Sequence, residues 1–381
     1  MGAANPRTTR LISHFGGVKE TYEALTAKGA AFEFALKPRE VKSLKKSSLE
    51  KAEELIEWCE KRNYNIVTFD APDYPEPLKH IYNPPLLLFT EGALSAIRSE
   101  IRINVIGTRK PSDYSCLVAS QLCAELAKTG IVTISGMAVG LDKCAMSSAL
   151  ENKGTVAGVL ACGIDVDYPR GSREFRNAVV ESGGVCISEL MPRDETRPTY
   201  FQYRNRIMSG LSSGTLIVEA GERSGCHITA LHAISQNRDL FCIPPHDILD
   251  PRYSGVIRYL RDGAIPVFSH IDIVNEYLSD VCERLGESAS PKDLEKPDTP
   301  PKRPTFKNKS PAPQPAPKAD YAQLPEEQGK IITALQKKKL TFDEIVKKKL
   351  CDADKTYEIL LDMELDGLVE KIAGDRYSVV K

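Results

Sequence analysis

Between Ile101 and Phe268, short continuous apolar runs alternate with amphipathic segments. Such runs are typical of strands that are buried on both faces of a parallel sheet. The segments between them predict helices, the first from about Tyr114 to Thr129 with Asp113 as its N-cap. Repeated strand–helix–strand units of this length predict right-handed crossovers, and therefore an α/β fold with a Rossmann-like, doubly wound parallel sheet. The predicted strands begin at Ile103, Ile131, Thr155, Val185, Thr215 and Leu240.

Loops rich in Gly, Ser and basic residues follow the predicted strands. A doubly wound sheet gathers the carboxyl ends of its strands along one edge, where ligands bind. Free backbone N–H groups in such loops, and the positive ends of the helices that follow, favour anions. The sequence therefore predicts a partner that carries several phosphate groups. The loops are GTRKPS from Gly107, SGMAVGLD from Ser135, CGIDVDYPRGS from Cys162, RNRIMSG from Arg204 and GERSG from Gly221, and their cations are Arg109, Lys110, Arg170, Arg204 and Arg206.

Motifs and composition narrow the kind of partner. The first strand ends in G-T-R-K, without the G-x-G-x-x-G turn of dinucleotide sites, and the P-loop pattern is missing. Hydride transfer and nucleoside triphosphate hydrolysis are therefore disfavoured, and no cofactor is expected. The formal net charge of −1 at pH 7 excludes a uniformly basic coat for nucleic acid. Any polyanion must bind to a local basic patch.

The flanking segments predict further domains. Residues 1–64 predict a small helical module, with a long amphipathic helix from Leu49 to Arg62. Residues 65–280 form the predicted Rossmann-like domain, and residues 281–320 a linker rich in Pro and Lys. We expect this linker to act as a solubilising tether, with a DNA-contacting arm as the less favoured alternative.

Residues 321–381 predict a winged-helix-like domain. Its helices are expected from Glu326 to Gln336, from a capping box at Thr341 and Glu344, and from Asp354 to Asp366, followed by a hairpin. The third helix is acidic and would repel DNA phosphates. A contact with a protein partner is therefore favoured over reading of duplex DNA.

Cysteine and histidine residues are scattered along the chain. There are 10 Cys without a C-x-x-C pair and 6 His without zinc-ligand spacing. We therefore expect reduced thiols in a cytoplasmic protein, and no metal site. No apolar segment has the length of a signal sequence core or a membrane span, so a soluble protein without membrane contact is expected.

A series of segments resembles the DNA-processing protein A family, also called DprA or Smf. In order they are GTRKPSDY, SGMAVGLD, GIDVDYPR, SEL, FQYRNRIMSGLS, VEA and SGCHITA, and the resemblance covers about residues 65 to 270. It implies a protein that binds single-stranded DNA with little sequence preference and loads a RecA-type recombinase. It also implies a homodimer, joined between about Ile257 and Val267, and a role in protecting DNA taken up in natural transformation.

The resemblance also implies a DNA site. Arg109 and Arg170 match the basic residues with which the family contacts DNA, and Lys110 lies beside the first of them. Arg204 and Arg206 match as well, and either contact DNA or brace the site through buried ion pairs. The residues expected to present their backbone to the DNA are Gly107, Thr108, Ser135, Gly136 and Gly163.

Aromatic residues near the basic loops are candidates for stacking bases, as sequence-tolerant single-strand binders require. Tyr168, Phe201 and Tyr203 either take this role or pack beneath the loops.

The chain departs from the family pattern at four positions. Val139 replaces an Arg, Met146 a His and Pro245 a Gly, and Ile257 stands where the pattern has Asn. These exchanges are expected at or near the loop edge. They indicate either the loss of a small ligand or a binding surface that does not need these groups.

Two other functions compete with DNA binding. A nucleotide hydrolase or phosphoribohydrolase would need a catalytic acid at this edge, where Glu219, Glu222 and Asp142 are available. None has a His or a nucleophile nearby in sequence, and Asp142 is expected to cap the helix that follows it. A scaffold without nucleic-acid contact would leave the loop arginines unexplained.

Overall fold

The computed structural model describes residues 6–26, 48–98, 101–285 and 326–348, together with residues 356, 359–360, 363, 368–372 and 376–379. The chain divides into two compact units, Met1–Pro291 and Lys292–Lys381. The boundaries expected at residues 64, 280 and 320 stay predictions. From residue 286 onward, the predicted linker lies outside the described residues.

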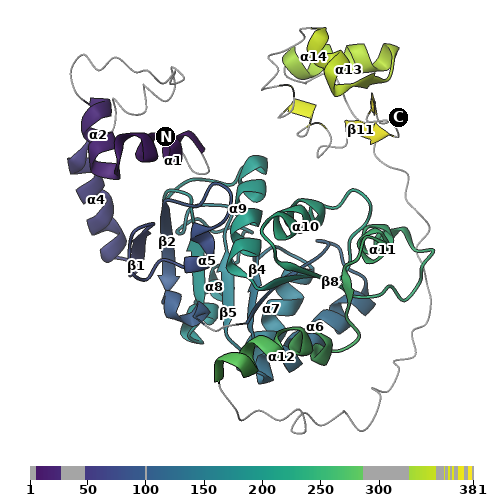
Figure 1. Cartoon of the computed structure of the whole chain (residues 1–381), viewed down its shortest axis with the longest axis horizontal. Coiled ribbons are helices and arrows are strands. Elements are labelled where there is room, and N and C mark those ends of the chain that lie inside the picture. Colours follow the sequence, from purple (N-terminus) through teal and green to yellow (C-terminus); the bar gives the residue numbers. More distant parts are fainter. Residues whose placement is uncertain are drawn as a thin grey trace. The chain divides into compact units, whose positions relative to one another are not determined.

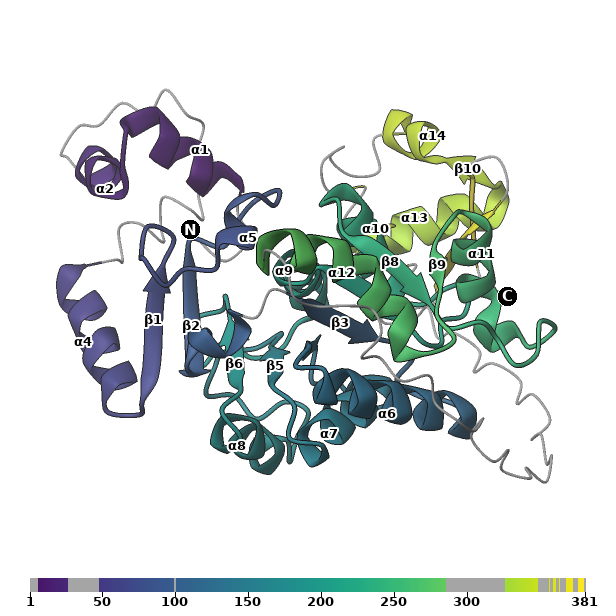
Figure 2. The same ribbon diagram turned by 60° about the horizontal axis from the view of Figure 1, so that its bottom comes forward.

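In the described part of the first unit, the strands form one nine-stranded sheet (Figure 1). Its order is β1-β2-β6-β5-β4-β3-β7-β8-β9, with β1 at one edge and β9 at the other (Figure 2). Neighbours from β6 to β9 in this order pair in parallel, whereas β1 and β2 form an antiparallel extension. The chain winds outward from β3 to β6 and returns to place β7 beside β3, so the switch point lies between these two strands. The strands are β1 Tyr64–Thr68, β2 Leu87–Gly92, β3 Arg102–Ile106, β4 Val132–Ser135, β5 Val156–Val159, β6 Val185–Ser188, β7 Gly214–Ile217, β8 Asp239–Cys242 and β9 Ile265–Pro266.

Helices cover both faces of this sheet. Successive residues of a strand point to opposite faces, and Leu216 and Ile217 of β7 accordingly belong to two different core clusters. The first cluster contains residues of α4, α6, α7, α8 and α12, and the second contains residues of α5, α9, α10 and α11. Their bounds are α4 Leu49–Glu60, α5 Glu76–Lys79, α6 Asp113–Lys128, α7 Leu141–Glu151, α8 Arg173–Glu181, α9 Pro198–Leu211, α10 Cys226–Ser235, α11 Ser254–Arg261 and α12 His270–Leu285. Helices α1 Pro6–Phe15 and α2 Val18–Thr26 precede them, and 3-10 turns cover Leu94–Ile97 and Pro251–Tyr253.

The predicted α/β fold is confirmed, and every predicted strand is present. Two local predictions are wrong. Ser112, not Asp113, is the N-cap of α6, because its side chain accepts a hydrogen bond from the Ser115 N–H. RNRIMSG is not a loop but part of α9, where Gly210 allows a close approach to α5: a Cβ there would lie 2.9 Å from the Leu78 side chain.

The second unit contains a small core of its own, which includes Ile331, Leu335 and Ile345. The described helices are α13 Glu326–Lys337 and α14 Phe342–Lys347, and the sheet order is β10-β12-β11. The predicted capping box is confirmed, with reciprocal hydrogen bonds between Thr341 and Glu344. The acidic residues of the predicted third helix, Glu358, Asp362, Glu364 and Asp366, lie outside the described residues. The strands are β10 Leu340–Thr341, β11 Val369–Ile372 and β12 Arg376–Val379.

Candidate nucleic-acid interface

The loops that follow β3 and β4 rest on one another at the carboxyl edge of the sheet. The Leu141 N–H donates to the Thr108 oxygen at 3.2 Å. A Cβ at Gly140 would lie only 2.6 Å from the same oxygen, and Gly140 has a φ of +87°, so a glycine is needed there. The Thr108 N–H donates to the Glu219 carbonyl oxygen, 3.0 Å away beyond β7. The β3 loop that carries Arg109 is therefore held at the switch point.

Arg109 lies against an aromatic cluster. Its Cζ is 4.9 Å from the centroid of the Phe201 ring, and Tyr168 meets this ring edge-on at 5.7 Å. Within the described residues, Arg109 forms no ion pair with a carboxylate. Arg109 and Lys110 are exposed, whereas the two rings are half-buried. A fixed cation beside partly accessible rings can hold a phosphate and stack a base.

Arg170 extends from the loop between β5 and α8. The Asp167 carboxylate fixes the turn behind it by accepting the Gly171 N–H at 2.7 Å and the Ser172 N–H at 2.9 Å. The fully buried Arg176 donates from Nη2 to the Tyr168 carbonyl oxygen at 2.9 Å. Arg170 itself is exposed, and its side chain contacts no other described residue through a hydrogen bond or ion pair. It is therefore available to an external anion.

Arg204 is an internal brace. Its side chain is buried, and Nη1 donates to the Gly136 oxygen at 2.6 Å and to the Val159 oxygen at 2.9 Å. The guanidinium thereby joins the carboxyl ends of β4 and β5. Burial lowers the pKa of Arg204, and the nearby Asp142 carboxylate opposes this shift. A Cβ on Gly136 would collide with the guanidinium, which explains the glycine.

Arg206 is a second internal brace. Its Nη2 forms a buried ion pair with Glu189, the residue after β6, at 2.6 Å. Arg204 and Arg206 therefore stabilise the edge from the interior of the protein. Neither is exposed as Arg109 and Arg170 are.

Several loop amides are already used within the protein. The Gly136 N–H donates to Asp142 Oδ2 at 3.2 Å, and the Gly163 N–H donates to the Asp194 oxygen at 2.8 Å. The Thr108 amide is occupied as described above. The expectation of free N–H groups is therefore wrong for these three residues, because each loop folds onto a neighbouring segment. Contact of these residues with DNA stays a prediction.

The other two predicted backbone positions support the packing of the edge. The Ser135 hydroxyl donates to the Val105 oxygen at 2.7 Å. Gly107 leaves the space that the Leu141 side chain fills.

Asp142 does not cap the helix that follows it. Its carboxylate accepts the N–H groups of Gly136 and Ala138, at 3.2 and 3.3 Å, from the preceding loop, while the N-cap position of α7 is Gly140. Burial raises the pKa of this carboxyl group, against the opposing charge of Arg204. Asp142 therefore fastens the β4 loop.

Glu219 occupies the place at which many Rossmann-like proteins hold a phosphate, the amino end of the helix after the first parallel strand. Its Oε2 accepts the Ser112 N–H at 3.0 Å and the Ser112 hydroxyl at 2.7 Å. The hydroxyls of Ser112 and Ser115 also lie 2.9 and 3.0 Å from that of the buried Tyr253. Sequence reasoning missed this network, although the VEA segment contains Glu219.

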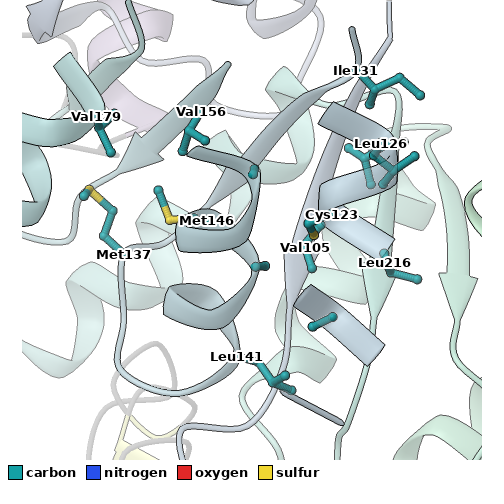
Figure 3. Packing of buried hydrophobic residues seen from close by; sticks show 14 of the residues in the cluster. Val105, Cys123, Leu126, Ile131, Met137, Leu141, Met146, Val156, Val179 and Leu216 are labelled. Carbon is teal, nitrogen blue, oxygen red and sulfur yellow. The ribbon is translucent and has the colours of Figure 1, made fainter. Parts of the chain in front are cut away.

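The departures from the family pattern lie in different surroundings. Val139 is 50% exposed, in the β4 loop. Met146 is fully buried in the first core cluster, near Met137 and Val156 (Figure 3). The expectation of a loop-edge position is therefore wrong for Met146, because it lies on the inner face of α7. Pro245 and Ile257 are half-buried.

The described residues contain no group of three or more His, Cys, Asp or Glu side chains that could hold a metal ion. Among the described residues, no helix has both the length and the apolar character needed to cross a membrane.

Comparisons with known proteins identify relatives of both units. A family model described as "DNA recombination-mediator protein A" matches residues 65–278, and one described as "DprA winged helix domain" matches residues 311–375. DNA processing protein DprA of Bacillus subtilis is 34% identical over 212 residues, which are 56% of this chain and 71% of that protein. Protein Smf of Escherichia coli is 36% identical over 211 residues, 55% of this chain and 56% of that protein.

Two solved structures share the fold. DNA processing protein A from Streptococcus pneumoniae has a TM-score of 0.54 and 26% identity, over 71% of this chain and 98% of its own. The protein from Helicobacter pylori, described for its "unique single-stranded DNA binding mode", has a TM-score of 0.51 and 27% identity, over 57% of this chain and 96% of its own. Since the first family model alone spans more than half of the sequence, the chain belongs to the DNA recombination-mediator protein A family.

Proposed function

We propose that this protein binds single-stranded DNA along the carboxyl edge of its large sheet, with little preference for base sequence. In the cytoplasm it protects incoming DNA and loads a RecA-type recombinase during natural transformation. It acts through binding and catalyses no reaction itself. The observation that carries the proposal is the exposed Arg109 on the Phe201 ring, with Tyr168 against the same ring. The single-strand binding mode named for the Helicobacter pylori relative supports the choice of ligand.

The second exposed arginine supports a path for a strand rather than a site for one phosphate. Arg170 follows β5 and Arg109 follows β3, so the two cations extend from strands that are separated by β4. A flexible strand can place successive phosphates on both. Phosphates carry no base information, which agrees with binding of many sequences.

A nucleotide-processing enzyme is the alternative, and the site geometry argues against it. Glu219 is tied to Ser112 at the amino end of α6, where its own negative charge would repel a nucleotide phosphate. Asp142 is tied to two backbone amides. Glu222 is exposed in the β7 loop. The hydroxyls beside Glu219 belong to the buried residues Ser112 and Tyr253, so this carboxylate does not face a substrate.

A homodimer belongs to the same proposal. Leu231 and Ile234 are exposed apolar residues on α10, one and two turns beyond His227. His227, near the amino end of the same helix, contacts Tyr259 of α11, in which Ile257 and Leu260 are half-buried. An apolar surface of this kind supports self-association.

The test is a fluorescence anisotropy titration with single-stranded DNA at several salt concentrations. Arg109→Ala and Arg170→Ala should each weaken binding, and each should lower the slope of log affinity against log salt by about 0.7. The double variant should lose both contributions, for any base composition. Arg98→Ala, which removes an exposed arginine near the opposite edge, is the matched control and should bind as the wild type does. If the double variant kept the wild-type affinity and salt slope, single-stranded DNA would not bind at this edge of the sheet.

A further inference from the structure

A second pair of aromatic rings lies at the carboxyl edge, apart from the Arg109 cluster. Tyr114 is in the first turn of α6, after β3, and His246 follows β8. Their ring centroids are 4.8 Å apart, with 42° between the ring planes. His246 is exposed and Tyr114 is half-buried. Tyr168 follows β5 and His246 follows β8, and these two strands lie on opposite sides of β3 in the sheet (Figure 2).

The pair rests on a rigid base. His246 meets the Tyr253 ring at 5.2 Å with an interplanar angle of 82°. Tyr253 is fully buried, and its hydroxyl is held by those of Ser112 and Ser115, of which Ser112 is bound in turn by Glu219. The hydrogen-bond network around Glu219 thus also supports the His246 ring, through Tyr253. A ring held in this way loses little conformational freedom when a base stacks on it.

The charges around the pair favour a strand that arrives from Arg109. Arg109 is part of the first cluster, and Lys110 follows it in the chain toward Tyr114; both cations are exposed. Tyr114 is five positions after Arg109, so their Cα atoms are at most about 18 Å apart, a distance that a few nucleotides can span.

Acidic residues are also near the pair, but most are engaged. Asp250 is paired with Arg252, and Asp247 accepts the Leu249 N–H. Asp113 is exposed beside Tyr114. A contact made through the rings is therefore better suited to this end of the edge than a contact with a phosphate.

We propose that Tyr114 and His246 form a second base-stacking platform, which extends the path of the single strand from the Phe201 cluster across β3 toward β8. The inference rests on the proposed function and predicts how the affinity depends on the length of the DNA. Short oligonucleotides fill only the Arg109 cluster, whereas longer ones also reach the second platform. Affinity therefore rises with length beyond what the first cluster alone provides.

Anisotropy titrations with oligothymidylates of increasing length test the platform. Tyr114→Ala and His246→Ala should bind the shortest oligonucleotides as the wild type does, and should lose on the order of tenfold in affinity for the longest. Tyr114→Phe keeps the ring and should keep the affinity. The salt slope should not change, because no phosphate contact is removed. Tyr82→Ala, at a 78% exposed tyrosine outside the edge, is the matched control.

The outcomes separate this platform from the proposed function. A wild-type protein that binds single strands, with alanine variants that match it at every length, overturns the platform and leaves the proposed function intact. A wild-type protein that binds no single strand overturns both. His246 is exposed, so His246→Ala tests the platform even if Tyr114→Ala does not fold. Emission of Trp58, the single tryptophan, during thermal unfolding checks the fold of each variant.

Discussion

At the scale of single residues, Glu189 and Arg206 form an ion pair from which water is almost excluded. Their side chains are 7% and 6% exposed, and an Arg206 nitrogen lies 2.6 Å from a Glu189 oxygen. Within the described part of the chain, Nε and Nη1 of Arg206 have no hydrogen-bond partner. The net stabilisation by the intact pair is therefore small, whereas removal of the Arg206 guanidinium takes away the opposite charge that the buried Glu189 carboxylate meets at 2.6 Å.

We expect Arg206→Met to lower the free energy of unfolding by about 3–5 kcal/mol, because the buried Glu189 carboxylate would lose the guanidinium that it meets at 2.6 Å. Adding Glu189→Gln to the same chain should restore much of this loss. Denaturant unfolding of the single and the double variant measures both effects. A double variant that is less stable than Arg206→Met would contradict the role of the pair as a brace.

The imidazole of His227 connects α10 to the β7 loop and to α11. Nε2 lies 2.6 Å from the Glu222 carbonyl oxygen, which can only accept, so Nε2 carries the proton. Nδ1 then accepts from the Tyr259 hydroxyl at 2.6 Å. Burial lowers the pKa of His227, chiefly because the charged ring would lose its hydration.

This shift predicts a pH dependence of stability. The unfolded chain takes up a proton near pH 6.5, whereas the folded protein resists it, so the free energy of unfolding falls as the pH falls through this value. His227→Gln should lose about 1 kcal/mol at pH 7.5. It should also show a smaller decrease in stability between about pH 7.5 and pH 5. Urea unfolding across this range would give equal decreases in both proteins if His227 did not contribute.

At the scale of elements, the loops after β3 and β4 act as one unit. Gly140→Ala places a methyl group against the backbone of Thr108 and Arg109, where the gap is 2.6–2.7 Å. We expect the two loops to separate, with a loss of stability and weaker binding of single strands, because Arg109 would move off Phe201.

Gly130→Ala is the control for this substitution. Gly130 also has a positive φ, +78°, but nothing lies within 4 Å of the added Cβ, so only the backbone strain of about 1–2 kcal/mol is expected. Denaturant unfolding measures the loss of stability in both variants, and anisotropy titration measures their affinity for single-stranded DNA. Equal effects on DNA binding would mean that the contact between the loops does not position Arg109.

Elements with a clear local sequence pattern were predictable. Continuous apolar runs indicated the buried parallel strands, and the capping box at Thr341 and Glu344 opened α14 as expected. The RNRIMSG segment was not predictable in this way, because its charges indicate exposure. Arg204 is buried only because the carbonyl groups of Gly136 and Val159, distant in sequence, converge on it. Strand β1 likewise forms only by pairing with β2.

At the scale of the whole molecule, the order of the strands brings the candidate site together. Loops that are far apart in sequence meet at one edge, so the positions of Arg109 and Arg170 followed from the strand pattern. The positions of Glu219 and its partners Ser112 and Tyr253 could not be predicted in this way, since one acidic residue and a few hydroxyl groups form no recognisable sequence pattern. Their role depends on the return of the chain to β7 beside β3.

Self-association is the property of the whole molecule that the α10 surface predicts. Leu231 and Ile234 are 60% and 53% exposed, and in a dimer with twofold symmetry the same stripe meets its copy. Burial of these side chains removes apolar area from water, whereas a carboxylate at the same place would be buried without a partner.

Light scattering of the full chain should therefore give twice the 42.1 kDa mass of one protomer. Ile234→Glu should shift the mass toward that of the monomer at micromolar concentration, because a charge at the centre of an apolar contact costs several kcal/mol. Ile248→Glu changes an apolar residue that is 74% exposed but lies in the β8 loop, and should leave the dimer intact. If the wild-type mass stays that of a monomer at every concentration, the stripe on α10 does not join two copies, and single-strand binding would have to be explained by one protomer alone.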